Sequence, residues 1–149
     1  MKDNDQIRML FTTSLSQTSR AYASVANKIA ATYGLSQATA WPAIMIARIG
    51  NRVRPGALAE TLGLDPSSLV RIIDQLVSAG IVERLEDPRD RRAKILSLTK
   101  TGKRVIAQVE RELISFRGEL LKDVPISDIQ TCVRVLGAFR SSVKSQELV

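Results

Sequence analysis

The sequence predicts a mainly α-helical fold with one small β-hairpin, of the α+β class. Over most of the chain, apolar residues recur every three or four positions, which is the spacing of an amphipathic helix. Residues 81–99 differ, because there two short β-rich runs flank a polar turn. With 149 residues, of which 44% are hydrophobic, the chain has enough apolar material for one core. We therefore expect one domain with an oligomerisation appendage.

The composition excludes several classes of function. The chain has no His and one Cys, which rules out the usual zinc and transition-metal sites and His-based acid–base catalysis. The sequence contains no paired-carboxylate motif, phosphate loop or nucleophile constellation, so we expect neither an enzyme nor a cofactor. A single Cys fits a reducing compartment, so we expect a cytoplasmic location. No apolar run approaches the ~20 residues of a membrane span, so no membrane partner is expected.

The first two helices are expected before residue 51. Residues 4–33 predict one long helix that ends at Gly34, a typical residue after a helix end. A second helix is expected after Leu35 and ends near Gly50. Ser36 as its N-cap places Pro42 in the second turn, where a hydrogen bond is lost, whereas Thr39 as the N-cap places Pro42 in the tolerated first turn. We therefore expect a late start or a kink.

Two shorter helices follow, joined by a turn that contains Gly63. The first is expected over residues 55–62, with Pro55 near its start. Asp65 as N-cap and Pro66 as the first helical residue begin the second, which is expected to run to Ala79. Its apolar side consists of Leu69, Ile72, Ile73, Leu76 and Val77. Its other side carries Ser67, Ser68, Val70, Arg71, Asp74, Gln75 and Ser78.

The second half of the chain predicts a hairpin and two more helices. Residues 81–85 and 93–99 predict short strands joined by a long charged loop over residues 86–92. A long helix is expected over about residues 101–122. Pro125 then breaks the chain, and Ser127 with Gln130 predicts a capping box that starts a last helix. Cys132 lies in the apolar stripe of that helix, so we expect a buried and unreactive thiol.

The excess of basic residues is concentrated in two places. The net charge is +7, and such a balance favours a polyanionic partner. Residues 84–104 contain eight bases against three acids, a local charge of +5, and a second cluster consists of Arg48, Arg52 and Arg54. Nucleic acid is therefore the polyanion that we expect, with a merely soluble basic protein as the alternative.

The two short helices form a candidate helix-turn-helix. Ala59 allows a close crossing, Gly63 supplies the turn and Leu69 supplies an apolar contact, although a plain helical hairpin would show the same residues. A hairpin directly after this pair predicts a winged helix. In that fold a helix enters the major groove of DNA, and a basic loop reaches the minor groove. A solvated charged turn remains the alternative for the loop.

The stretch from Pro55 to Gly102 resembles the MarR family of bacterial winged-helix transcription regulators. The motifs that carry the resemblance are GALAETLG at residues 56–63, LVSAGIVER at 76–84, DPRDRRAK at 87–94 and LTKTG at 98–102. The resemblance implies an obligate homodimer that binds a pseudo-palindromic operator in double-stranded DNA. It also implies a small organic effector, often an aromatic or phenolic anion, that modulates the affinity for DNA.

The resemblance also implies roles for individual residues. Arg71 would contact a base or phosphate from the second short helix, and Asp90 would orient Arg92 in the minor groove. Val70 stands where family members often have Thr, so the base preference is expected to differ. The expected DNA-binding residues are Arg54, Ser67, Ser68, Arg71, Gln75, Arg89, Asp90, Arg91 and Arg92. The expected effector-binding residues are Arg20, Tyr22, Trp41 and Met45, with an ordinary core role as the alternative for Trp41 and Met45.

The terminal helices have apolar faces and little globular body to cover them. They could fold back on their own domain, but we favour a dimerisation layer made of both ends, since a helix of about 22 residues is ~33 Å long. We expect an N-terminal dimerisation helix over residues 1–34, a winged helix-turn-helix DNA-binding domain over 35–100 and C-terminal dimerisation helices over 101–149.

The sequence thus predicts a sequence-specific DNA-binding transcription regulator, a repressor, that acts as a homodimer and is associated with the bacterial nucleoid when bound to DNA. One alternative is a non-specific architectural DNA-binding protein, although the polar face of the second short helix argues against it. Another is a winged helix that serves protein contacts. Competition between operator and genomic DNA distinguishes the sequence-specific regulator from the architectural DNA-binding protein.

Overall fold

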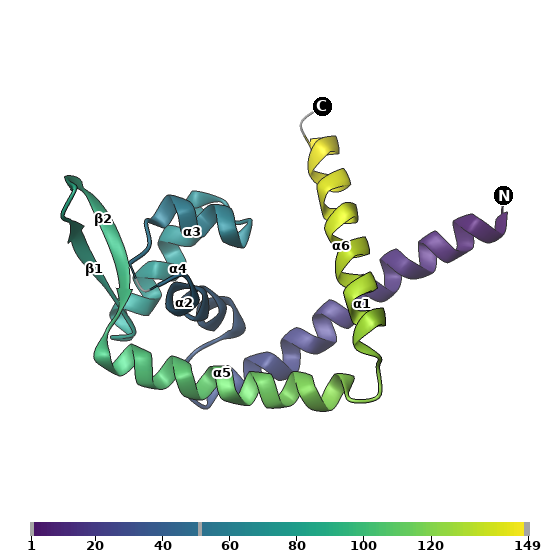
Figure 1. The fold of residues 1–149 in the computed structure, drawn as a ribbon, viewed down its shortest axis with the longest axis horizontal. Coiled ribbons are helices and arrows are strands. Elements are labelled where there is room, and N and C mark those ends of the chain that lie inside the picture. The colour runs from purple at the N-terminus through teal and green to yellow at the C-terminus, as the bar shows by residue number, and fades with distance from the viewer. Residues whose placement is uncertain (1, 51, 148–149) are drawn as a thin grey trace. The chain divides into compact units, whose positions relative to one another are not determined.

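The computed structural model describes residues 2–50 and 52–147, and it confirms the mainly α-helical fold with one hairpin (Figure 1). The elements are α1 (Lys2–Ala31), α2 (Gln37–Ile49), α3 (Pro55–Leu62), α4 (Pro66–Ser78), β1 (Val82–Asp87), β2 (Asp90–Leu98), α5 (Lys100–Leu121) and α6 (Ile126–Glu147). The chain divides into two compact units, Met1–Leu113 and Ile114–Val149.

The first unit contains the hydrophobic core. Its central side chains come from α2, α3, α4, the hairpin and α5, and they include Ile44, Ile46, Leu58, Leu69, Leu76, Leu96, Ile106 and Val109. From α1, Ala26 and Ala30 reach this core. The second unit consists of the end of α5, the connection that follows and α6, in which no described residue is buried. The core therefore supports the winged helix-turn-helix elements.

The connection between α1 and α2 is a tight turn. Gly34 has a φ of +74°, and the Leu35 N–H donates to the Ala30 carbonyl across it. Ser36 is the N-cap of α2 and forms a capping box with Thr39, while the Gln37 N–H donates to Asn27 Oδ1 at 2.8 Å. The expected late start of this helix is therefore wrong. These bonds stabilise the first turn, and α2 continues through Pro42 at the cost of one backbone hydrogen bond.

The two short helices begin and end close to the predicted residues. Gly63 has a left-handed conformation, with a φ of +64°, directly after α3. Asp65 caps α4, and its side chain accepts the Ser67 N–H at 3.1 Å. Ala59 and Leu69 are both buried, which matches the expected close crossing. The helix α4 ends at Ser78, one residue before the predicted end.

The hairpin is longer and its turn is tighter than predicted. Pairing runs antiparallel from Val82↔Leu98 to Glu86↔Lys94, and then the register shifts so that Asp87 pairs with Asp90. The predicted long loop over residues 86–92 is therefore wrong, because most of it belongs to the strands. Two carboxylates fold this end of the hairpin: Asp87 accepts the Arg89 N–H at 2.9 Å, and Asp90 accepts the Arg92 N–H at 3.0 Å. The shift leaves residues 91–93 as a bulge.

The start of α5 packs closely against the start of the hairpin. Thr99 Oγ1 accepts the Gly102 N–H at 2.9 Å and donates to the Gly80 carbonyl at 2.6 Å. A Cβ atom on Gly102 would lie 2.0 Å from the Ile81 carbonyl oxygen, so only glycine fits this approach.

The last helix differs from its prediction at two residues. The Pro125 carbonyl accepts the N–H groups of Asp128 and Ile129, so α6 begins at Ile126 and the predicted capping box at Ser127 is wrong. Backbone bonds to Pro125 place Ser127 inside the first turn. Cys132 is exposed in the single chain, which corrects the expected burial of its thiol. The apolar side chains predicted for this helix lie along α6, and none of the described residues of α6 is buried.

Candidate nucleic-acid interface

The helix α4 presents one polar face to the exterior of the first unit. Leu69, Ile73 and Leu76 are buried on its inner side. Ser68, Arg71 and Gln75 are exposed on its outer side, as the sequence predicts. Between them lies Val70, an apolar side chain that is 56% exposed. An exposed helical face with a guanidinium, an amide and a hydroxyl has the donors and acceptors that base edges recognise.

Ser67 has a local structural contact that the sequence did not predict. Its hydroxyl and its backbone N–H both donate to Asp65 Oδ2 at the start of α4. The Ser67 hydroxyl, followed by the Ser68 and Ser67 N–H groups, lowers the pKa of Asp65. Ser67 therefore lies at the predicted position, and its hydroxyl is already engaged in the start of the helix.

An ion pair joins α4 to the hairpin. Arg84 Nη2 on β1 donates to Asp74 Oδ1 on the exposed side of α4. A second pair, between Lys94 and Glu86 at 3.7 Å, crosses the two strands. Both pairs are exposed, so each contributes little to stability. The Arg84–Asp74 pair places a guanidinium of the hairpin beside the polar outer side of α4.

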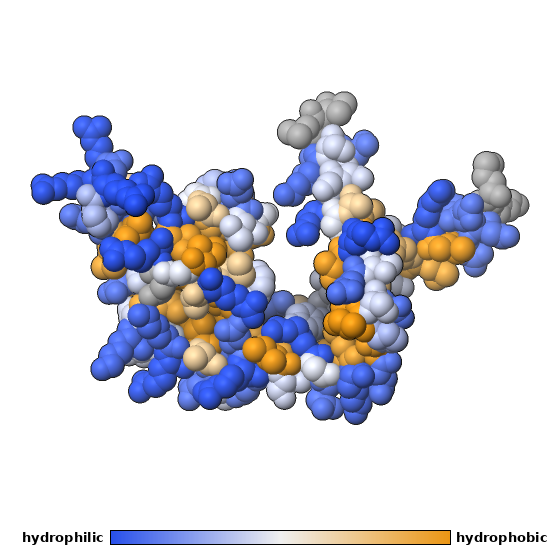
Figure 2. All heavy atoms as spheres, viewed as in Figure 1, coloured by the Kyte–Doolittle hydropathy of each residue, from blue (hydrophilic) through white to orange (hydrophobic). Residues whose placement is uncertain are grey.

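The end of the hairpin carries the basic residues that the sequence singled out. Arg89, Asp90, Arg91 and Arg92 are all exposed. Figure 2 shows hydrophilic side chains gathered over the end of this hairpin. The contact between Asp90 and Arg92 involves the backbone N–H of Arg92. In the structure Asp90 therefore contacts the backbone of Arg92, and its carboxylate supports the turn from which the Arg92 side chain extends.

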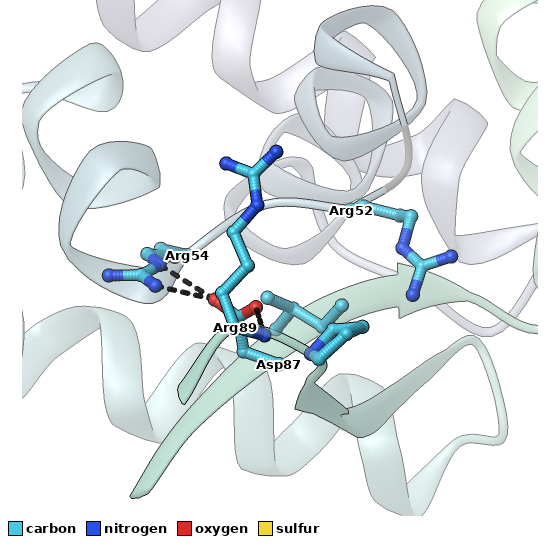
Figure 3. A pocket seen from close by; sticks show the side chains of 6 residues that line it. Arg52, Arg54, Asp87 and Arg89 are labelled. Atoms are coloured by element: carbon cyan, nitrogen blue, oxygen red, sulfur yellow. Dashed lines mark hydrogen bonds and ion pairs between the residues drawn. The ribbon is translucent and has the colours of Figure 1, made fainter. Parts of the chain in front are cut away.

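Arg54 and Asp87 form the most buried ionic contact of this region (Figure 3). Arg54, the residue before α3, donates to Asp87 Oδ2 from Nε at 3.0 Å and from Nη2 at 2.5 Å. The other oxygen, Oδ1, accepts the Arg89 N–H. The Arg89 N–H bond and then the Arg54 bonds hold the pKa of Asp87 below its ordinary value. Arg54 was predicted to contact DNA, and here it also attaches α3 to the hairpin turn.

Sequence reasoning missed the role of Asp87. The sequence interpretation assigned this carboxylate no contact and counted it only among the three acids of residues 84–104. In the structure it is 6% exposed and accepts three hydrogen bonds. An Asp-Pro pair at a turn was the available signal, but nothing local connects Asp87 with Arg54, which lies 33 positions earlier.

The residues predicted to bind an effector lie on α1 and α2. Trp41 is 46% exposed and lines a cleft of about 230 Å³, together with Gln37, Ala38, Pro42, Leu62, Leu64 and Ile72. Tyr22 and Met45 are half-buried against the core, and Arg20 is exposed and donates to Ser16 Oγ at 2.9 Å. Arg20, Tyr22 and Met45 do not line the cleft that contains Trp41. The partly buried position of Met45 against the core agrees with the alternative that Met45 is an ordinary core residue.

Two other features are absent from residues 2–50 and 52–147, a metal-ligand cluster and a membrane-spanning helix. No group of three or more His, Cys, Asp or Glu side chains in these residues is placed to hold a metal ion. None of the described helices combines the length and hydropathy that crossing a membrane requires.

Comparison with known proteins places these features in one family of structures. A model of the MarR family matches residues 37–94, which include α2, α3, α4, β1 and the first part of β2. The transcriptional regulator PA3341 is 33% identical over 91% of this chain and 98% of that chain, with a TM-score of 0.76. CouR from Rhodococcus jostii RHA1, bound to p-coumaroyl-CoA, is 26% identical over 84% of this chain and 87% of that chain, with a TM-score of 0.77.

The same fold occurs in a structure with nucleic acid. A mutant of MarR from E. coli, complexed with operator DNA, has a TM-score of 0.77 to this chain. The two are 24% identical, and the match covers 91% of this chain and 96% of that chain.

Proposed function

Because the chain belongs to the MarR family of transcription regulators, we propose that it is a repressor that binds a pseudo-palindromic DNA operator as a homodimer. The observation that carries the proposal is the exposed polar face of α4 beside an arginine-rich hairpin. Arg84 and Asp74 join these two elements directly. We also propose that the protein has a regulatory role and not a catalytic one. Its proposed location is the cytoplasm, where the DNA is.

In this proposal α4 occupies the major groove and the hairpin occupies the minor groove. Ser68, Arg71 and Gln75 contact base edges or phosphates, with Ser67 beside them.

Arg91 and Arg92 enter the minor groove, where a narrow A·T tract attracts arginine, and Asp90 supports the turn that carries them. Arg54 and Arg89 contribute positive charge nearby. The structure of MarR from E. coli complexed with operator DNA supports DNA binding by this fold.

The proposed partner of the terminal helices is a second copy of the chain. The helix α6 buries no described residue, although several large apolar side chains lie along it. Figure 2 shows apolar side chains on the visible surfaces of both α6 and α1. The exposed ones are Ile7, Met9, Leu10, Val25, Ile126, Val133, Val135, Leu136, Phe139 and Val143. Apolar faces of this extent cover each other in an oligomer, so residues 1–34 and 101–149 form the dimerisation layer and 35–100 the DNA-binding domain.

A small organic anion is the proposed effector. CouR, a relative, is bound to p-coumaroyl-CoA. In this chain the half-exposed indole of Trp41 offers a stacking surface, and Arg20, Tyr22 and Met45 are the other proposed contacts. An effector that binds one spacing of the two α4 helices better than another would shift the population away from the form that fits successive major grooves.

The test is selection of genomic fragments with the purified protein, followed by competition gel shifts. A regulator selects a small set of fragments and retains them against excess unrelated DNA. Equal affinity for every fragment would favour the architectural DNA-binding protein instead. A folded dimer that shifts no fragment would favour a winged helix that serves protein contacts.

A further inference from the structure

A basic cleft lies where the connection between α2 and α3 meets the turn of the hairpin. Its lining residues are Arg52, Arg54, Asp87, Pro88, Arg89 and Ile95, and its volume is about 480 Å³. Pockets that hold small molecules span roughly 300–1,000 Å³, so this cleft is large enough for an anionic group and its water. All six residues belong to the first unit.

The cleft has three guanidinium groups and a single carboxylate. Asp87 accepts hydrogen bonds at both of its oxygens, from Arg54 at Oδ2 and from the Arg89 backbone N–H at Oδ1. The guanidinium groups of Arg52 and Arg89 have no hydrogen bond or ion pair with any residue in the described part of the chain. In the view of Figure 3, Arg89 extends away from Asp87, between Arg54 and Arg52. The cleft therefore has uncompensated positive charge that faces an open space.

We propose that Arg52 and Arg89 bind a phosphate group in this cleft and that Arg54 is a positioning residue. A guanidinium presents its N–H groups in a planar fork that matches two phosphate oxygens. Asp87 interacts electrostatically with Arg54 and Arg89 but carries only one negative charge against three guanidinium groups, so the cleft keeps a net positive charge. Arg54 instead holds the hairpin turn that carries Arg89, and Arg89 lines the same cleft as Arg52.

Two sources could supply the phosphate group. One is the backbone of bound DNA, and this source rests on the proposed function. The other is a free molecule that carries a phosphate group. Both are recognised by the same chemistry, and neither involves Arg91 or Arg92 in the bulge of the hairpin. Two measurements on the full chain separate them.

The first measurement is the salt dependence of binding to a mixed-sequence DNA duplex, followed by fluorescence anisotropy. The variants are Arg52→Gln and Arg89→Gln, and Arg52→Lys and Arg89→Lys, which keep the positive charge, are the matched control. The slope of log Kobs against log salt is negative, and each lost phosphate contact reduces its magnitude by about 0.9. If the DNA backbone fills the cleft, the magnitude of the slope falls by about this amount in Arg52→Gln and Arg89→Gln and stays unchanged in the control.

The second measurement is calorimetric titration of the DNA-free protein with inorganic phosphate at constant ionic strength. If a free phosphate group fills the cleft, the wild type binds phosphate, and both cleft variants lose at least about tenfold in affinity. The salt slope on DNA is then unchanged. Circular dichroism confirms that each variant is folded, and neither removes a contact of the described structure.

Each outcome decides the proposal. A change in either measurement that is shared by Arg52→Gln and Arg89→Gln supports the phosphate site and identifies its source. Wild-type behaviour of both variants in both measurements overturns it, even if Arg92→Ala still weakens DNA binding and the proposed function stands. If the wild type binds no duplex, the proposed function fails, and the phosphate titration alone decides the site.

Discussion

The carboxylate of Asp87, at the turn of the hairpin, accepts two hydrogen bonds from the guanidinium of Arg54, the residue that precedes α3. The Asp87 side chain is 8% exposed and that of Arg54 is 54% exposed. This contact connects the first helix of the helix-turn-helix to the hairpin. The position of the basic hairpin relative to α3 therefore depends on a pair of side chains that lie far apart in the sequence.

Asp87→Asn is expected to destabilise the protein. The amide retains the shape of the side chain but loses the charge that strengthens three hydrogen bonds. We expect the melting temperature to fall by roughly 3–10 °C, as measured by circular dichroism at neutral pH. Asp90→Asn is the matched control, since Asp90 is exposed and accepts one backbone hydrogen bond. An equal fall in both variants would contradict the special role of Asp87.

The contribution of Asp87 is also expected to depend on pH. Its pKa in the folded protein lies below the ordinary value of 3.8, first because of the Arg89 N–H and then because of Arg54. Its stabilisation is therefore fully present above about pH 4 and is lost as the pH falls through the lowered pKa. The difference in melting temperature between wild type and Asp87→Asn should shrink below pH 4. A difference that persists unchanged at the lowest pH would show that the charge is not its source.

Gly102→Ala is expected to destabilise the junction of α5 with the hairpin. The new Cβ would lie 2.0 Å from the Ile81 carbonyl oxygen, so the backbone must move. We expect a loss of about 1–3 kcal/mol in the free energy of unfolding, measured by urea denaturation. Gly118→Ala, also in α5 but with open space at its Cβ position, should instead gain about 0.5–1 kcal/mol. A neutral Gly102→Ala would argue against the close approach.

Arg92→Ala is expected to weaken operator binding. Removal of a minor-groove guanidinium should lower affinity and reduce the slope of log Kobs against log salt by about 1. Gel shifts or anisotropy over a salt series measure both quantities on a selected fragment. Lys122→Ala, which removes a charge after the end of α5, is the control and should leave the slope unchanged. Unaltered affinity of Arg92→Ala at every salt concentration would rule out the minor-groove assignment.

Val133→Asp is expected to weaken the proposed homodimer. Val133 is 64% exposed on the apolar stripe of α6, and a buried, unpaired charge at an interface is costly. We expect the dissociation constant of the dimer to rise about 30-fold or more, as measured by sedimentation velocity. Ala138→Asp is the control, because five residues along a helix place it on the opposite side from Val133. A dimer that tolerates Val133→Asp would place the interface elsewhere.

Much of the fold follows from local patterns in the sequence. Helical spacing of apolar residues predicted α1, α3, α4 and α5 closely, because periodicity and end signals such as Gly63 and Asp65 act over a few residues. The same local signals failed where two of them competed. Pro42 favoured a late start for α2, but the capping box of Ser36 and Thr39 stabilised the earlier one. At the hairpin, Asp87 and Asp90 folded a turn that the charged composition had suggested to be a long loop.

The sequence by itself determined the order of the elements, the polar face of α4 and the concentration of arginine in the hairpin. These properties depend on residue type and spacing within one element. Only the tertiary structure decided that Asp87 binds Arg54, that Asp74 binds Arg84 and that Arg52 and Arg89 line one cleft. The physical reason is that these side chains are separated by many residues, and packing of the core brings them together. Short-range rules of helix and turn formation contain no information about such distances.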